Sequence, residues 1–456
     1  MIKSNGNKLK IFILSDDVRL FSGVGIMTDL ISRAFVKEGW DVVHVAGSVR
    51  PTEQPLIDDI GRKILPCDGY GNLQIIRDLI KQEKPDLMWI MTDPRYFVWL
   101  WSFEDEIRTK IPIIYYHVWD APPTPKYNFS YFNSCDSILC ISKLSYNIVK
   151  QCKEETKGTF NNTYCPHGVP TEVFKPLGWS DLFEDLQKKM EWEKKGKKPE
   201  DKPPDISLEE FKGKLTQAVR QWNKDPEKIK FIVFWTNKNM RRKNAPTLME
   251  AFHKFAKDKD DVMLLLHTEV VTDHGTDLSV VRDTLFKDVP IVLFPEKIPT
   301  EELVRFYNIA DCVINIASAE GFGLSNLEAM ACGIPTISIK TGGLQDQFYC
   351  NDDVDKPCGI QIDPASQILV GSPPTPYLYD DYINVDGVTD ALEEMYNQKM
   401  KSINGEENEY KQWGKNGREN AVNNFNEEKM CQQHIYEVKR LLKEWSPRKK
   451  YVCEEV

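Results

Sequence analysis

The chain has 456 residues, of which 41% are hydrophobic and 28% are charged. This length exceeds the size at which one hydrophobic core usually keeps growing, so we expect two domains, and the composition excludes a disordered or fibrous chain. The formal net charge of -10 gives no general reason to bind polyanions, so a nucleic-acid partner would need a local basic patch.

Neither the cysteines nor the amino terminus indicates a secreted or membrane-spanning protein. The eleven cysteines show no paired CxxC spacing of the kind that holds a metal, and we interpret them as reduced thiols. The first apolar run, Ile11–Leu14, is short and ends in acidic residues rather than in a cleavage site. Because no apolar run approaches the thickness of a bilayer, the sequence predicts a cytoplasmic protein without a transmembrane segment.

Two series of short β-rich runs alternate with helical patterns along the chain. The first series, within the first 142 residues, comprises KIFILS, DVVHVA, DLMWIM, IPIIYY and SILCIS. The second series, within residues 230–339, comprises KFIVFW, VMLLLH, IVLF, CVINIA and PTISI. Such alternation is typical of parallel sheets covered by helices, so we predict an α/β protein with two Rossmann-like domains.

The first turn between a strand and a helix contains Ser22, Gly23, Val24 and Gly25. Glycines allow a ligand to approach the backbone, and the start of a helix offers free N–H groups to a phosphate. The spacing differs from the dinucleotide-binding GxGxxG, because Thr28 occupies the position of the third glycine. A simple tight turn explains this segment about as well as a phosphate site does.

Two segments carry no strand pattern. Residues 178–228 are dense in charge and predict an exposed helical or loop insertion near the domain junction, with an acceptor-binding or membrane-touching lid as the alternative. The segment GSPPTPYLYDDYINVDG, residues 371–387, resembles a loop, and helical patterns follow from Val388 to Leu442.

The most informative pattern is SAEGFGLSNLEAMACGIPTISIKTGG, which occupies residues 318–343. It follows the apolar run CVINIA and leads into a short helical pattern from Leu324 to Cys332, which Gly333 then stops. A phosphate would fit the start of this helix. Glu328, one turn inside the helix, would then accept hydrogen bonds from a ribose diol, and Glu320 would lie on the sugar side of the phosphate.

Glu320 and Glu328 reproduce the E-x7-E motif of the retaining glycosyltransferases of family 4, which this segment resembles. The segment HGVPTEVFKP, residues 167–176, is similar to the interdomain segment of that family, and SDDVRLFSGVG and YYHVWDAPP resemble glycosyltransferases encoded by large DNA viruses. The resemblance implies a GT-B fold, in which the parallel sheets of two Rossmann-like domains face each other across a cleft. The donor would lie on the second domain and the acceptor on the first, with no metal or other cofactor required.

The family also implies positive side chains after the first strand of the second domain, where they would neutralise a leaving diphosphate. Arg242 and Lys243 occupy that place, just before a helix that Asn244 would cap. Asn237 stands where family members commonly carry an arginine. Whether Lys238, Arg241 or Arg242 replaces that arginine is left open by the sequence.

In the first domain, His117 and Asp120 follow the strand IPIIYY, at the sheet edge where open α/β proteins bind ligands. The resemblance implies that His117 lies near the transferred sugar. Asp120 would activate the acceptor as a base, or would merely close a turn ahead of prolines. The expected catalytic residues are therefore His117, Asp120 and Glu320, and the expected donor-binding residues are Gly23, Val24, Gly25, Asn237, Arg242, Lys243, Glu320, Gly321, Phe322, Gly323, Leu324, Glu328 and Gly343.

From these patterns we predict a first domain over residues 1–170, the insertion at 178–228, a donor domain over 229–425, and a terminal helix over 426–456 that packs back on the first domain. The predicted activity is retaining transfer of a sugar from a nucleotide-diphosphate sugar to a hydroxyl acceptor, with a glycan or lipid-linked glycan favoured. Transfer to a hydroxylated base in DNA is one alternative. A nucleotide-sugar-binding or scaffold protein without catalysis is the other.

Overall fold

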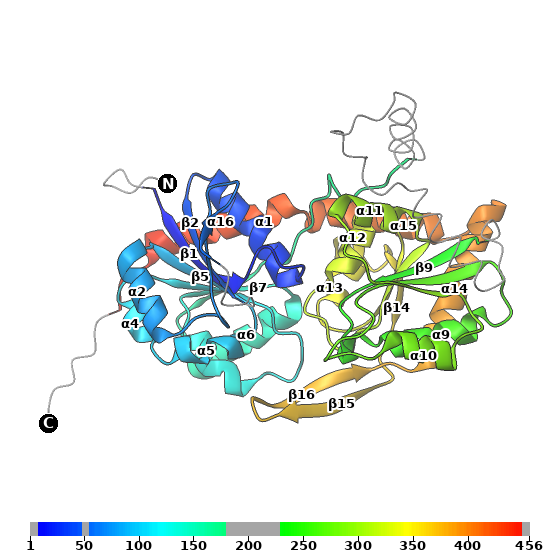
Figure 1. Ribbon diagram of the computed structural model, residues 1–456, viewed down its shortest axis with the longest axis horizontal. Helices are drawn as coiled ribbons and strands as arrows, with labels where there is room; N and C mark the ends of the chain where they lie inside the picture. The colour runs from blue at the N-terminus through cyan, green and yellow to red at the C-terminus, as the bar shows by residue number, and fades with distance from the viewer. Residues whose placement is uncertain (1–7, 48–53, 179–228, 449–456) are drawn as a thin grey trace.

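The computed structural model describes residues 8–47, 54–178 and 229–448. These residues form two α/β lobes that lie side by side (Figure 1). Apart from its first residue, the predicted insertion at 178–228 lies outside the described residues.

The first lobe contains an eight-stranded sheet and the helices that cover it. Its strands are β1 (Lys10–Asp16), β2 (Asp41–Gly47), β3 (Leu56–Ile57), β4 (Lys63–Pro66), β5 (Leu87–Met91), β6 (Ile113–His117), β7 (Ser137–Cys140) and β8 (Asn161–Tyr164). Its helices are α1 (Gly23–Lys37), α2 (Leu73–Glu83), η1 (Pro94–Phe97), α3 (Val98–Trp101), α4 (Glu104–Arg108), η2 (Lys126–Asn128), α5 (Phe129–Asn133) and α6 (Lys143–Thr156).

The second lobe contains a six-stranded sheet, a separate hairpin and the remaining helices. Its strands are β9 (Phe231–Thr236), β10 (Val262–His267), β11 (Ile291–Phe294), β12 (Cys312–Asn315), β13 (Thr336–Ile339), β14 (Gly359–Ile362), β15 (Ser366–Ser372) and β16 (Thr375–Tyr382). Its helices are η4 (Arg241–Lys243), α9 (Ala245–Ala256), α10 (Leu278–Leu285), α11 (Thr300–Ile309), α12 (Leu324–Ala331), α13 (Leu344–Phe348), η5 (Cys350–Asp352), α14 (Val385–Asn404) and α15 (Tyr410–Asn424). The last helix, α16 (Glu427–Glu444), packs on the first lobe.

Both sheets have the strand order of a doubly wound α/β domain. The first sheet runs β3-β4-β2-β1-β5-β6-β7-β8, and the second runs β11-β10-β9-β12-β13-β14. Among the described strands of the first sheet, only β3 is antiparallel to its neighbour. The strand order reverses between β1 and β5 and again between β9 and β12, and ligands of such folds bind outside the carboxyl ends of the strands at these points. The structure confirms the predicted α/β protein with two Rossmann-like domains.

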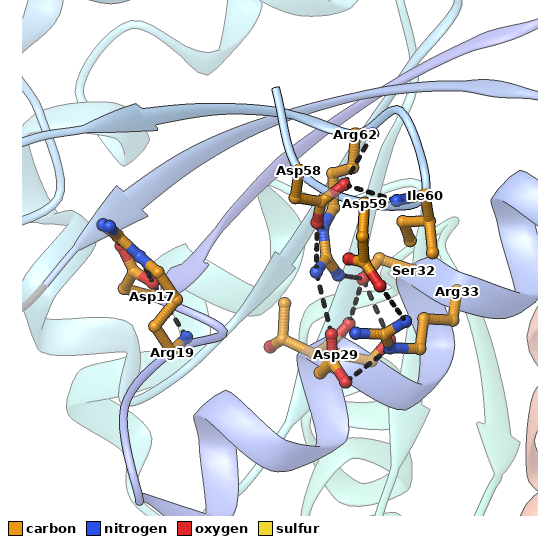
Figure 2. A network of polar contacts seen from close by, with 10 residues as sticks. Asp17, Arg19, Asp29, Ser32, Arg33, Asp58, Asp59, Ile60 and Arg62 are labelled. Atoms are coloured by element: carbon orange, nitrogen blue, oxygen red, sulfur yellow. Dashed lines mark hydrogen bonds and ion pairs between the residues drawn. The ribbon is translucent and has the colours of Figure 1, made fainter. Parts of the chain in front are cut away.

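A network of buried charges fixes α1, the helix that follows the first glycine-bearing turn, to the segment before β4 (Figure 2). Arg62 is only 1% exposed, and its guanidinium pairs with Asp29 at 2.8 Å and with Asp58 at 2.7 Å. The same guanidinium donates to Ser32 of α1. Removal of one partner from a buried ion pair typically costs about 3–5 kcal/mol, so this network holds α1 firmly against the sheet.

Helix α16 returns from the second lobe to the first (Figure 1). His434 of α16 is fully buried, accepts a hydrogen bond of 3.3 Å from the Trp89 indole, and packs edge-on against the Tyr116 ring. The Tyr116 hydroxyl in turn lies 2.7 Å from Nδ1 of His167, whose ring packs against Phe322 of the second lobe. One apolar cluster therefore runs without interruption from the first sheet into the second lobe.

Residues 371–387, which resemble a loop in sequence, contain part of a β-hairpin instead. Strands β15 and β16 pair antiparallel and form a two-stranded sheet of their own. The hairpin reaches the first lobe, because the Tyr379 amide donates to the Pro122 carbonyl at 2.6 Å and the Tyr127 hydroxyl donates to the Tyr377 carbonyl at 2.9 Å. Because prolines and acidic residues are uncommon in strands, the composition of this segment did not predict the hairpin.

Candidate active site

The residues of the E-x7-E segment and the basic residues of η4 meet at the switch point of the second sheet. Arg242 and Lys243 follow β9, and Glu320 follows β12, which is the neighbouring strand. The carboxyl ends of two adjacent parallel strands open at the same sheet edge, which brings these side chains together.

Lys243 and Glu320 form a buried ion pair. Lys243 is 7% exposed and Glu320 is 9% exposed. Burial by itself would raise the pKa of Glu320, but the charges of Lys243 and Arg242 lower it below its ordinary value. Burial lowers the pKa of Lys243, and Glu320 opposes that effect. Glu320 is therefore ionised and holds the ammonium group in one position.

Arg242 lies between the two lobes. Its guanidinium donates to the Ala319 carbonyl and stands 4.0 Å from a carboxylate oxygen of Asp120 in the first lobe. Burial raises the pKa of Asp120 above its ordinary value, with Arg242 opposing and Glu320 adding to the rise. A cation and two carboxylates from the two lobes thus surround one point of the junction.

Helix α12 begins beside this cluster without a side-chain cap. Its N-cap residue, Gly323, has φ +92°, a conformation that favours glycine, and it supplies no capping side chain. The Gly343 amide donates to the Glu320 carbonyl at 3.0 Å, and the Gln347 amide group donates to the Phe322 carbonyl. These bonds fix the loop that leads into α12, so that the start of the helix presents its positive dipole end to the junction.

Glu328 lies one turn further along α12, at the side of the same junction. It accepts a hydrogen bond of 2.5 Å from the hydroxyl of Tyr307 in α11. Burial raises the pKa of Glu328 to about 7, although the bond from Tyr307 opposes that rise. Its charge therefore changes close to neutral pH.

The first glycine-bearing turn, by contrast, satisfies its own polar groups. The Ser22 hydroxyl accepts a hydrogen bond from the Gly25 amide at 2.9 Å and donates to Asp16 at 2.8 Å. A Cβ atom at Gly25 would lie 2.8 Å from the Leu20 carbonyl oxygen, so close packing within the turn requires this glycine. Val24 packs against the core, and Gly23 faces Leu324 of α12 across the junction, where an added Cβ would lie 3.4 Å from the leucine.

The structure distinguishes the basic residues near Asn237, the position at which the family that the sequence resembles commonly carries an arginine. Lys238 is exposed, Arg241 is exposed next to the hairpin, and Arg242 is the guanidinium that lies at the junction. The side-chain nitrogen of Asn237 is buried and has no hydrogen-bond partner among the described residues, so it can still donate to a ligand. Asn244 does not cap α9 as expected, because its amide group donates to the Ile316 carbonyl at 2.8 Å.

His117 packs into the first lobe, and both of its ring nitrogens lack a hydrogen-bond partner among the described residues, so its place near the transferred sugar stays a prediction. Its ring is fully buried and packs against Phe132 of α5, with a centroid distance of 4.8 Å, and against Tyr115. Burial lowers the pKa of His117 to about 3. The physical reason is strand alternation, since Ile113, Tyr115 and His117 share the face of β6 that α5 covers.

Several residues of the junction were not found from the sequence. Asn315 donates to Glu320 at 3.5 Å, and Tyr307 holds Glu328. Asp346 joins the lobes, because it accepts from the Lys143 amide at 2.7 Å and from the Tyr164 hydroxyl at 3.1 Å. Only Asn315 carried a sequence signal, as a polar residue at the end of an apolar strand.

Within the described ranges, no group of three His, Cys, Asp or Glu side chains is arranged to hold a metal ion. The ten cysteines in these ranges are all free. In the same part of the chain, no helix combines the length and the apolar character that crossing a bilayer requires.

Residues 217–368 match the family model "Glycosyl transferases group 1". The matched range contains Arg242, Lys243, Glu320 and Glu328, which are the residues that form the cluster beside α12. A D-inositol 3-phosphate glycosyltransferase from Pseudarthrobacter chlorophenolicus is 28% identical over 185 residues, which cover 37% of this chain and 43% of that protein. An N-acetyl-alpha-D-glucosaminyl L-malate synthase from Bacillus anthracis is 28% identical over 166 residues, covering 35% and 41%. The matched part of the chain thus spans less than half the length of these relatives.

Solved structures resemble nearly the whole chain. Sucrose-phosphate synthase from Thermosynechococcus elongatus aligns with a TM-score of 0.64 and 15% identity over 96% of this chain and 100% of that one. HepE from Anabaena, in complex with UDP-glucose, aligns with a TM-score of 0.62 and 15% identity over 95% and 100%. These similarities show the fold: the chain has the two-domain GT-B architecture, as predicted.

Proposed function

We propose that this chain is a glycosyltransferase that takes a sugar from a nucleotide-diphosphate sugar, and that the donor binds to the second domain at the start of α12. The observation that carries the proposal is the convergence of Arg242, Lys243 and the uncapped start of α12 on one point. Preorganised positive side chains and a helix dipole stabilise the negative charge that develops on a leaving diphosphate. The matched family model supports the same activity.

The remaining donor contacts follow from the positions of the two glutamates. Glu328 would accept hydrogen bonds from the ribose hydroxyls, and Glu320 would hold hydroxyls of the sugar while it orients Lys243. The unpartnered amide of Asn237 would donate to a phosphate oxygen. The UDP-glucose complex of HepE, a protein of the same fold, supports a nucleotide sugar as the donor.

We propose a retaining transfer that needs no metal ion. A phosphate oxygen of the donor takes the proton of the acceptor hydroxyl. The bond between the anomeric carbon and the phosphate oxygen breaks, and the acceptor oxygen bonds to the same face of the sugar. Asp120, beside Arg242, would orient the acceptor hydroxyl from the first domain. An added Cβ at Gly23 would lie 3.4 Å from Leu324, so the two domains approach closely there, which would keep water from the reacting atoms.

The acceptor is a hydroxyl compound of carbohydrate or polyol type. The name of one relative supports this class, since it refers to an inositol phosphate, which is a phosphorylated polyol. The name of another refers to malate, a hydroxy acid that shares only the hydroxyl group. Catalysis distinguishes this function from the scaffold alternative, and the nature of the acceptor distinguishes it from transfer to DNA.

Donor binding and hydrolysis across a panel of nucleotide sugars test the proposal, with and without a chelator. We expect one donor to bind saturably and to be unaffected by the chelator. Glu328→Ala should weaken its binding about tenfold, the effect of losing a hydrogen bond to a charged group. Glu301→Ala, which removes an exposed carboxylate from the start of α11, is the matched control. Failure of every nucleotide sugar to bind would contradict the proposal, and loss of activity in chelator would contradict its metal independence.

A further inference from the structure

A pocket lies beside Arg242, between η4 and the β15–β16 hairpin. Its volume is about 370 Å³, within the range of about 300–1,000 Å³ that small-molecule sites occupy. Arg241 and Arg242 contribute one wall, and Asp380, Ile368 and Val370 of the hairpin contribute the other. None of the donor contacts proposed above except Arg242 belongs to this pocket.

The polar groups of the pocket are arranged for a ligand rather than for one another. Among the described residues, neither the Arg241 guanidinium nor the Asp380 carboxylate has a hydrogen-bond or ion-pair partner, although burial raises the pKa of Asp380 and the charge of Arg242 opposes that rise. Asp381, which also lines the pocket, is already bonded to Gln367 at 2.8 Å. One donor fork and one acceptor carboxylate therefore remain available.

The hairpin supplies apolar surface beside these groups. Every residue of β15 is exposed, and Ile368 and Val370 of that strand, 45% and 36% exposed, line the pocket. The formal charges of two arginines and two aspartates cancel, so the pocket has no net positive charge that would select an anion. A saccharide matches this mixture, because its hydroxyls both donate to carboxylates and accept from guanidinium groups, while its C–H faces cover aliphatic side chains.

The pocket adjoins the donor cluster through direct contacts. The Ser318 amide donates to the Arg242 carbonyl at 2.8 Å, and the Asp381 amide donates to the Ser318 carbonyl at 2.8 Å. Asp380 directly follows Tyr379, whose amide bonds to Pro122 of the first domain. A ligand in this pocket would therefore lie next to Arg242 and the junction where transfer takes place.

We propose that the hairpin pocket is a carbohydrate-binding subsite that holds part of a saccharide acceptor, with Asp380 and Arg241 as the residues that recognise it. The acceptor role rests on the glycosyltransferase function proposed above, whereas the binding of a saccharide does not. An experiment can therefore contradict saccharide binding in this pocket without contradicting the glycosyltransferase function, and the reverse also holds.

The test is ligand-observed NMR with the whole chain and a panel of glucose, mannose, N-acetylglucosamine and their disaccharides, together with inorganic phosphate. We expect at least one saccharide to bind, and Asp380→Asn and Arg241→Gln each to weaken it about tenfold. Asp363→Asn is the matched control, because this carboxylate lies just before the hairpin, pairs with Lys340 at 3.3 Å, and lines no part of the pocket.

Three results would overturn the proposal: no saccharide of the panel binds, saccharide binding is the same in Asp380→Asn as in the control, or phosphate rather than a saccharide depends on Arg241. Nucleotide-sugar binding, measured in the same samples, tests the proposed function independently. If a saccharide binds in a manner that depends on Asp380 but no nucleotide sugar binds, the result would support the carbohydrate subsite. The same result would contradict the proposed glycosyltransferase function.

Discussion

The two domains each place a glycine-bearing turn between a strand and a helix, but the two turns treat their polar groups in opposite ways. In the first domain, Ser22 caps α1, Asp16 accepts from Ser22 and Tyr70, and Asp17 pairs with Arg19 at 2.6 Å. The groups that would bind a ligand are thus engaged within the turn itself.

In the second domain some of the corresponding groups stay open. Gly323 provides no side-chain cap for α12, and the Asn237 amide has no partner within the described ranges. Arg242 donates to the Ala319 carbonyl and also stands 4.0 Å from Asp120 across the junction. Similar glycine patterns in a sequence therefore do not imply similar sites. What distinguishes a ligand-binding turn from a structural one is whether neighbouring side chains already satisfy the helix start.

Substitution of one basic residue in each turn should separate the two turns most clearly. Lys243→Gln should lower the affinity for the nucleotide sugar about 100-fold, because a buried cation that faces the diphosphate is lost. Arg19→Gln, in the first turn, should change the affinity less than about threefold. Calorimetric titration of both variants checks this, with thermal unfolding as the control for folding. Equal losses would show that both turns hold the diphosphate.

Donor binding at the second turn should depend on pH through Glu328. Glu328, with a pKa raised to about 7, is neutral at lower pH and ionised at higher pH. Since an ionised carboxylate accepts the stronger hydrogen bonds from a ribose, affinity should rise about tenfold as the pH increases through 7. Tyr307→Phe removes the bond that lowers this pKa, so the rise should move to higher pH.

Titration with a nucleotide sugar at a series of pH values checks this prediction. Both phosphates of a nucleotide-diphosphate sugar are esterified, so the donor itself does not change charge near pH 7. Glu328→Gln should flatten the profile. A rise that persists unchanged in Glu328→Gln would assign the titration to another group.

The smallest effect is expected in the first turn. Ser22→Ala removes the cap of α1 and should lower the free energy of unfolding by about 1 kcal/mol. Donor affinity should stay within about twofold, because the Ser22 hydroxyl is engaged with Asp16 and Gly25. Chemical denaturation and titration measure the two quantities. A large loss of affinity without a loss of stability would give this turn a direct role in binding.

The sequence predicted the α/β class and ten of the described strands, because buried parallel strands are rich in apolar and β-branched residues. It missed β3, β4, β8, β14 and the β15–β16 hairpin, which are short, are rich in polar residues or contain proline. Such strands are specified by their neighbours in space rather than by local pattern.

For the site, local motifs located Glu320, Glu328, Arg242 and Lys243, since each stands at a fixed spacing from a strand end. Tyr307 and the hairpin pocket depend on contacts between distant segments, which no local pattern reveals. The position of His117 at a strand end did not reveal the alternation of β6, which turns its ring toward Phe132, and its role near the sugar stays a prediction. Three statements stay predictions: the resemblance to glycosyltransferases encoded by large DNA viruses, the cytoplasmic localisation and the exact acceptor.

The most direct test is a crystal structure of the protein with the nucleotide diphosphate that binds best among UDP, GDP and ADP. We expect phosphate oxygens within hydrogen-bond distance of Lys243 and of the amides at the start of α12, with ribose hydroxyls on Glu328. A diphosphate bound at the start of α1, with Lys243 still engaged only by Glu320, would contradict this expectation.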